Sequence, residues 1–123
     1  MAFDTPEGKV KKVGYEAVDK YADWQYRPVK GTAIGSNSEP DQLLLIHGKF
    51  VGAEFKARSK DKPTPLQAGR LKAIHDGGGI ALVIDASNVD WFVKFLSGED
   101  DRILRDEELG ALRWQSIKVR TIE

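Results

Sequence analysis

The order of apolar segments predicts an α/β domain in three layers, with helices on both faces of a mixed central sheet. The first observation is an apolar hairpin, in which Gln42–Ile46 runs into a His-Gly turn and returns as residues 49–56. The second is the continuous apolar run Ile80–Ile84, which is typical of a strand that is buried on both faces and parallel to its neighbour. The third is that segments with helical start signals precede the hairpin and flank this run.

Start and stop signals place each helix. Thr5 is suited to cap the first helix, because Pro6 then takes the first helical position, where its missing N–H does no harm. A second helix is expected from Thr64 to Asp76, ahead of three consecutive glycines, and a third after a cap within residues 87–90. Before the hairpin, residues 25–29 are expected to supply one more strand.

The chain has 123 residues, of which 41% are hydrophobic, and this size suits one domain with one core. We therefore expect a single domain over residues 1–123, with a core over about residues 5–96 and a C-terminal extension over residues 97–123. In the extension, residues 103–112 are expected to form a short helix, and residues 116–122 alternate as an edge strand does. That strand could serve this sheet or a partner's, which leaves room for a homodimer.

The composition limits the kinds of metal site that the chain can form. The formal net charge is zero and there is no cysteine, so thiolate metal sites are excluded, and the two histidines cannot form a zinc site by themselves. Any metal must therefore be held by oxygen. The N-terminus lacks an apolar signal segment and no run approaches the length of a membrane span, so a soluble, cytoplasmic protein without a membrane partner is expected.

The hairpin brings two carboxylates together. If His47-Gly48 is a two-residue loop, Asp41 falls opposite Glu54, and Lys56, two residues further on, shares their face. Two carboxylates about 4 Å apart repel by roughly 4 kcal/mol at an effective dielectric near 20. A divalent cation such as Mg²⁺ or Mn²⁺ removes this repulsion. The alternative is an ordinary solvated ion pair between Glu54 and Lys56 on a surface hairpin.

A third acid, Glu7, lies in the first helix. At about 100° per residue it falls on the apolar stripe of that helix. The other members of the stripe are Val10, Gly14, Ala17 and Tyr21. A favourable charge in the first helical turn would explain the position of Glu7 along the helix but not its face. Glu7 is therefore a candidate to join the acids of the hairpin.

Basic and amide side chains follow the hairpin. Four cations in residues 56–62 could bind a phosphate backbone, or could form a solvated loop, and the zero net charge argues against a broad basic surface. Besides Lys56, these cations are Arg58, Lys60 and Lys62. In the second helix, Gln67 has capping-box spacing from Thr64, and Arg70 is a further candidate for contact with a phosphate backbone.

Together these elements resemble the VRR-NUC branch of the PD-(D/E)XK nuclease superfamily, which includes small phage proteins. The resemblance covers roughly residues 5–96. Its matching elements are Thr5-Pro6-Glu7-Gly8-Lys9, Pro40-Asp41, Gly48-Lys49-Phe50, Glu54-Phe55-Lys56 and Pro65-Leu66-Gln67. One departure is Glu39, at a position where relatives commonly have glycine, and it could place a fourth acid near the metal.

The resemblance implies a restriction-endonuclease-like fold and a metal-dependent DNA endonuclease. By that resemblance Glu7, Asp41 and Glu54, with the carbonyl of Phe55, hold one or two Mg²⁺ or Mn²⁺ ions. Lys56 then orients the attacking water or stabilises developing charge. Gln67 is implied to lie by the active site, where it can hydrogen-bond a water or the DNA backbone.

The same resemblance suggests a role in phage DNA replication, recombination or repair, in the host cytoplasm. A minimal domain has little surface for reading sequence in a groove, so selectivity for a Holliday junction, flap or nick is expected over sequence-specific restriction. A junction resolvase would need two sites in a symmetric dimer. Two alternatives remain: a catalytically silent nuclease-like domain that binds DNA or a replication protein, and a small ligand-binding domain in which the acids are incidental.

Overall fold

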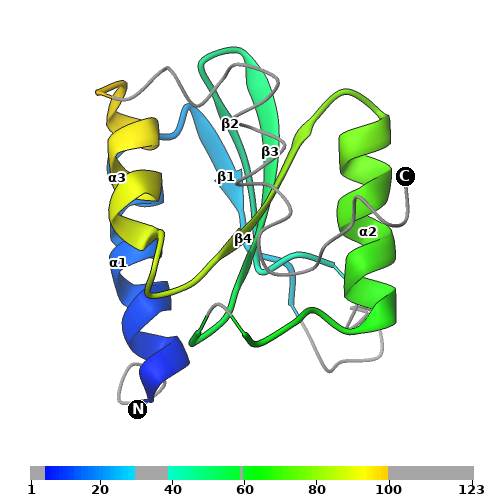
Figure 1. The fold of residues 1–123 in the computed structure, drawn as a ribbon. Helices are drawn as coiled ribbons and strands as arrows, with labels where there is room; N and C mark the ends of the chain where they lie inside the picture. The colour runs from blue at the N-terminus through cyan, green and yellow to red at the C-terminus, as the bar shows by residue number, and fades with distance from the viewer. Residues whose placement is uncertain (1–4, 30–38, 59, 100–123) are drawn as a thin grey trace.

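A computed structural model describes residues 5–29, 39–58 and 60–99, and it shows a mixed α/β arrangement. In chain order the elements are α1 (Pro6–Tyr21), β1 (Trp24–Tyr26), β2 (Gln42–Ile46), β3 (Lys49–Phe55), α2 (Pro65–Asp76), β4 (Ile80–Ile84) and α3 (Val89–Ser97). Helices α1 and α3 lie on one side of the sheet and α2 lies on the other (Figure 1). The predicted α/β class with helices on both faces is confirmed.

The four strands form one mixed sheet in the order β1-β2-β3-β4. The first three are antiparallel, whereas β4 runs parallel to β3, as its continuous apolar sequence predicts. In the hairpin Ile46 pairs with Lys49 and Leu45 pairs with Phe50, which confirms the predicted two-residue loop. His47 and Gly48 have φ values of 53° and 73°, and positive φ at both loop positions is what a type I′ turn requires.

The core has two parts, one on each face of the sheet. Under α1 and α3, Phe55, Phe92 and Phe95 are almost completely buried. Under α2 the buried cluster consists of Leu71, Ala81 and Val83, with Ile74 packed against it. Strand β4 contributes to both parts and every one of its residues is buried, so it joins the two halves of the core.

Helix α1 approaches the sheet closely at Gly14. A β-carbon at that position would overlap the ring of Phe55, with only 2.7 Å to its Cζ atom. The absence of a side chain therefore lets α1 pack directly over the end of β3. This contact positions the first turn of α1, which carries Glu7, beside the end of the hairpin.

Two local predictions need correction. The strand expected at residues 25–29 is β1, which starts earlier and is shorter, because Arg27 turns back to α1 and donates to the carbonyl of Tyr15 and the carboxylate of Asp19. Asn88 is the residue before α3, but its side chain makes no cap hydrogen bond. It instead holds the backbone at the end of β4, through bonds of 2.8 and 3.0 Å.

The predicted helix at residues 103–112 and strand at residues 116–122 lie outside the described residues. Among the helices of residues 5–29, 39–58 and 60–99, none combines the length and the apolar character needed to cross a membrane.

Candidate active site

The two hairpin acids lie on one face of the sheet, at the end of the hairpin remote from its turn. Asp41 directly precedes β2, and because Gln42 pairs with Ala53, one further step in this register places Asp41 opposite Glu54. Both residues are buried, with exposed fractions of 8% and 3%. The backbone N–H of Phe55 donates to Asp41 Oδ2 at 2.9 Å, which fixes the orientation of that carboxylate.

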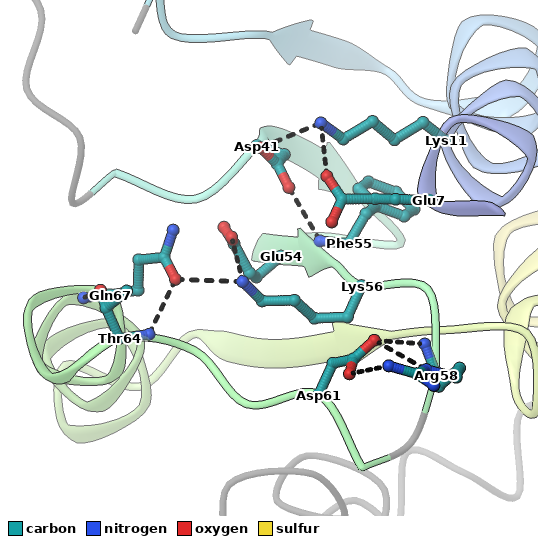
Figure 2. A network of polar contacts seen from close by, with 10 residues as sticks. All are labelled: Glu7, Lys11, Asp41, Glu54, Phe55, Lys56, Arg58, Asp61, Thr64 and Gln67. Atoms are coloured by element: carbon teal, nitrogen blue, oxygen red, sulfur yellow. Dashed lines mark hydrogen bonds and ion pairs between the residues drawn. The ribbon is translucent and has the colours of Figure 1, made fainter. Parts of the chain in front are cut away.

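Lys56 connects the hairpin to α2. Its Nζ lies 3.6 Å from Glu54 Oε2 and 3.3 Å from Gln67 Oε1. Figure 2 shows Glu54, Lys56 and Gln67 turned toward one another. The side chains of Lys56 and Glu54 are only 16% and 4% exposed, so this is not the solvated surface ion pair considered as an alternative. A buried pair of this kind requires additional polar contacts, and Gln67 supplies one.

Gln67 forms the predicted capping box and also contacts Lys56. Its Oε1 accepts from the backbone N–H of Thr64 at 2.9 Å, while the Thr64 hydroxyl accepts from the N–H of Gln67 at 3.2 Å, which completes a capping box. The same Oε1 also accepts from Lys56. The helix cap therefore holds the amide in the orientation that contacts the ammonium.

Glu7 lies at the border of this group rather than inside it. Its side chain is 43% exposed, so its predicted place on the buried stripe is wrong, and Gly8 and Val10 are the buried residues of that turn. Burying a carboxylate without close partners is costly, and Glu7 instead forms an ion pair of 3.1 Å with Lys11, one helical turn further on.

Lys11 is the residue that sequence reasoning missed. Its Nζ contacts Glu7 and lies 3.8 Å from Asp41 Oδ1, so it bridges the helix acid and the hairpin acid (Figure 2). The i, i+4 spacing from Glu7 was the signal available in the sequence. Its contact with Asp41 had no such signal, because it depends on how α1 packs over β3.

The pKa values of two neighbouring side chains report the negative field of the site. Burial by itself lowers the pKa of Lys11, but Asp41, followed by Glu7 and Glu54, outweighs this effect and raises the pKa above its usual value. Burial, and next the charge of Asp41, also raises the pKa of the Tyr15 phenol. All three predicted acids therefore act electrostatically on the same small region.

The oxygen donors are compatible with a small hard cation. Within the part of the chain that the structure describes, no group of three or more His, Asp or Glu side chains is arranged to hold a metal. Mg²⁺ sites commonly use only one or two carboxylates and complete their coordination with water and substrate phosphate. Asp41 and Glu54 meet that requirement, whereas Glu7 is directed to Lys11.

The predicted DNA-contact residues do not form one cluster. Arg58 is hydrogen-bonded to Asp61 in the loop after β3, and Lys60 and Lys62 are exposed on the same loop. Arg70 lies on α2, with its Nε 3.5 Å from Glu39 Oε2. Glu39, the suggested fourth acid, is thus engaged with Arg70.

In comparisons with known proteins, no family model matches the chain, and no curated protein gives a significant sequence match. The functional interpretation therefore depends on the arrangement of side chains at the end of the hairpin.

Proposed function

We propose that this domain is a metal-dependent DNA endonuclease that hydrolyses phosphodiester bonds. The observation that carries the proposal is that two buried carboxylates, Asp41 and Glu54, share a sheet face with a lysine ammonium that contacts Glu54 and Gln67. Buried charges are costly, and a protein retains such a group where it serves binding or chemistry. The resemblance of the same residues to a nuclease motif gives the reaction type.

Asp41 and Glu54, with the backbone carbonyl of Phe55, would hold Mg²⁺ or Mn²⁺. When bound, the metal lowers the pKa of a water and polarises the scissile phosphate. Asp41 is suited to this role because the Phe55 amide already fixes one of its oxygens. Glu7 would act from the border of the site, through its ion pair with Lys11.

Lys56 would orient the attacking water or stabilise the negative charge that develops on the phosphate. Its ammonium is held by Glu54 and Gln67, so little rearrangement is needed when the reaction proceeds. Gln67 would hydrogen-bond a water or the DNA backbone with its amide nitrogen, since its oxygen serves the helix cap and Lys56.

Branched or interrupted DNA is the substrate class that we propose, such as a Holliday junction, flap or nick. Of the cations predicted to contact phosphate, Lys60 and Lys62 are exposed on one loop and Arg70 is exposed on α2. Such contacts position a backbone but do not read its sequence.

Cleavage of labelled DNAs tests the proposal directly. Duplex, single-stranded, flap and four-way-junction DNAs are incubated with Mg²⁺, Mn²⁺ or EDTA, using wild type, Asp41→Asn, Lys56→Met and the surface control Lys12→Met. We expect metal-dependent products that both site variants reduce by at least about a hundredfold, while the control cleaves normally. Intact DNA under every condition would refute a nuclease, and retained DNA binding in that case would identify a non-cutting module.

A further inference from the structure

Within residues 5–29, 39–58 and 60–99, helix α2 covers only one half of its sheet face, and the other half carries aromatic side chains. Trp24 pairs with Leu45, which pairs with Phe50, and Tyr26 pairs with Leu43, so these five residues project from one face. We refer to them as the aromatic strip. Trp24 and Tyr26 are 47% and 50% exposed, and Leu45 and Phe50 are 42% and 37% exposed. A contiguous exposed apolar surface of this kind marks an interaction site.

The aromatic strip is continuous with the candidate active site. Asp41 precedes Leu43 by two residues and therefore shares its face, and Tyr26 lies directly across from Leu43. At about 3.3 Å per residue and 4.8 Å between strands, the backbone of Tyr26 is roughly 8 Å from that of Asp41. Trp24 is two residues further along the same strand. A bound polymer that runs from Asp41 toward β1 would therefore contact Tyr26 first and Trp24 next.

The geometry of the two rings suits flat partners. The rings of Trp24 and Tyr26 lie 20° from parallel, with their centroids 6.4 Å apart. Both belong to β1, which pairs only with β2 and forms one edge of the described sheet. The two nearly parallel rings therefore lie side by side along one edge of the described sheet.

A hollow of about 330 Å³ separates the aromatic strip from α2. Leu43, Phe50 and Ile74 contribute to its apolar lining, and Arg70 and Glu39 add polar groups. The Arg70 side chain is 57% exposed, and an exposed ion pair contributes little stability, so a phosphate can replace Glu39 as the partner of Arg70. An apolar floor beside a guanidinium matches the two parts of a nucleotide, its flat base and its phosphate.

We propose that the aromatic strip binds unpaired nucleotides of the DNA strand that enters the active site, with bases stacked on Tyr26 and Trp24. This inference rests on the proposed nuclease function and deepens it. Aromatic side chains stack on every base, whereas a continuous duplex keeps the faces of its bases covered. Of the proposed substrates, the strip therefore selects a flap, which has an unpaired segment next to the scissile phosphate, over a nick or a fully paired junction.

Binding in the absence of metal tests the strip separately from cleavage. Fluorescence anisotropy of a labelled oligothymidylate is measured in EDTA with the full chain, comparing wild type, Trp24→Leu/Tyr26→Leu and the control Val13→Ala, which alters an exposed apolar residue of α1. Leucine keeps the strand apolar but removes both rings. We expect the double variant to bind about a hundredfold more weakly, roughly tenfold for each ring, with the control unchanged.

The outcomes separate the two proposals. If the folded double variant binds the oligonucleotide as tightly as the wild type, the proposal that the aromatic strip binds nucleotides is refuted, even if the wild type cuts DNA. If binding depends on the two rings but the wild type cuts no DNA, the nucleotide-binding proposal is supported and the nuclease proposal is refuted. Folding of the double variant is checked by its circular dichroism and by an unchanged metal-induced shift in melting temperature.

Quenching of Trp24 fluorescence identifies the occupant of the strip. In a variant of the 123-residue chain with Trp91→Phe and Trp114→Phe, acrylamide should quench Trp24 freely, and oligothymidylate should protect it. Protection without DNA at every protein concentration would mean that residues 100–123 cover the strip. Protection that increases with protein concentration would mean that a second copy covers it. Either result would overturn the inference.

Discussion

Replacing Lys11 with methionine should lower the stability of the metal-free protein and raise its affinity for metal. The Lys11 ammonium lies 3.1 Å from Glu7 and 3.8 Å from Asp41. Methionine keeps a long, unbranched side chain but removes the charge. If a metal binds Asp41, the ammonium and the metal compete for the same carboxylate, so removal of one favours the other.

The magnitude follows from the distance to Asp41. Two unit charges 3.8 Å apart attract by about 4 kcal/mol at an effective dielectric near 20. The Lys11 side chain is 26% exposed, and desolvation offsets part of this attraction. We therefore expect Lys11→Met to lower the free energy of unfolding in EDTA by about 1–2 kcal/mol. The same free energy should appear as a roughly 5- to 30-fold increase in metal affinity.

Urea denaturation in EDTA and across a Mg²⁺ series measures both effects, because a bound ligand stabilises the folded state by RT ln(1 + [L]/Kd). Lys12→Met is the matched control: its ammonium pairs with Glu16 at 2.9 Å in an exposed position on the same helix. We expect it to change stability by less than about 0.5 kcal/mol and metal affinity not at all. Equal or weaker metal affinity in Lys11→Met would refute the shared-carboxylate argument, and a wild type insensitive to metal would refute the metal site itself.

Three further substitutions test the packing that positions the site, each by urea denaturation. Gly14→Ala should lower stability, since overpacking against the buried Phe55 ring costs about 1–3 kcal/mol and outweighs a helix-propensity gain of up to about 1 kcal/mol; a more stable variant would contradict the close approach of α1. A β-carbon at position 69 would have open space around it, so Gly69→Ala should raise stability by about 0.5–1 kcal/mol. A loss of stability would mean that this side of α2 is covered. Asn88→Ala should cost about 1–3 kcal/mol, because the Asn88 side chain makes two buried hydrogen bonds; no loss would show that water replaces them.

The hairpin was predictable because its determinants are local. A period of two assigns residues to faces, and a two-residue loop sets the pairing, so the positions of Asp41, Glu54 and Lys56 on one face follow from counting. The cap of α2 was predictable for the same reason, since Thr64 and Gln67 are three residues apart and complete a capping box. These short-range relations placed most of the candidate site.

The environment of Glu7 was not predictable from helical periodicity. Periodicity gives the direction in which a side chain projects, but it does not show whether a buried partner lies in that direction. The contact between Lys11 and Asp41 depends on the distance of α1 from the hairpin, which Gly14 and the Phe55 ring determine. A long side chain can then choose among partners that are far apart in the sequence.

The amino-acid sequence alone determined the α/β class, the register of the hairpin and the grouping of two acids with Lys56, because each depends on residues close together in the chain. Tertiary packing decided the burial of Glu54 beside Lys56, the bridge that Lys11 makes and the exposure of Trp24 and Tyr26 at an edge of the described sheet. Exposure and ion pairing depend on which elements cover a surface. Among the elements that the structure describes, α2 covers one half of its sheet face, and the aromatic half is exposed.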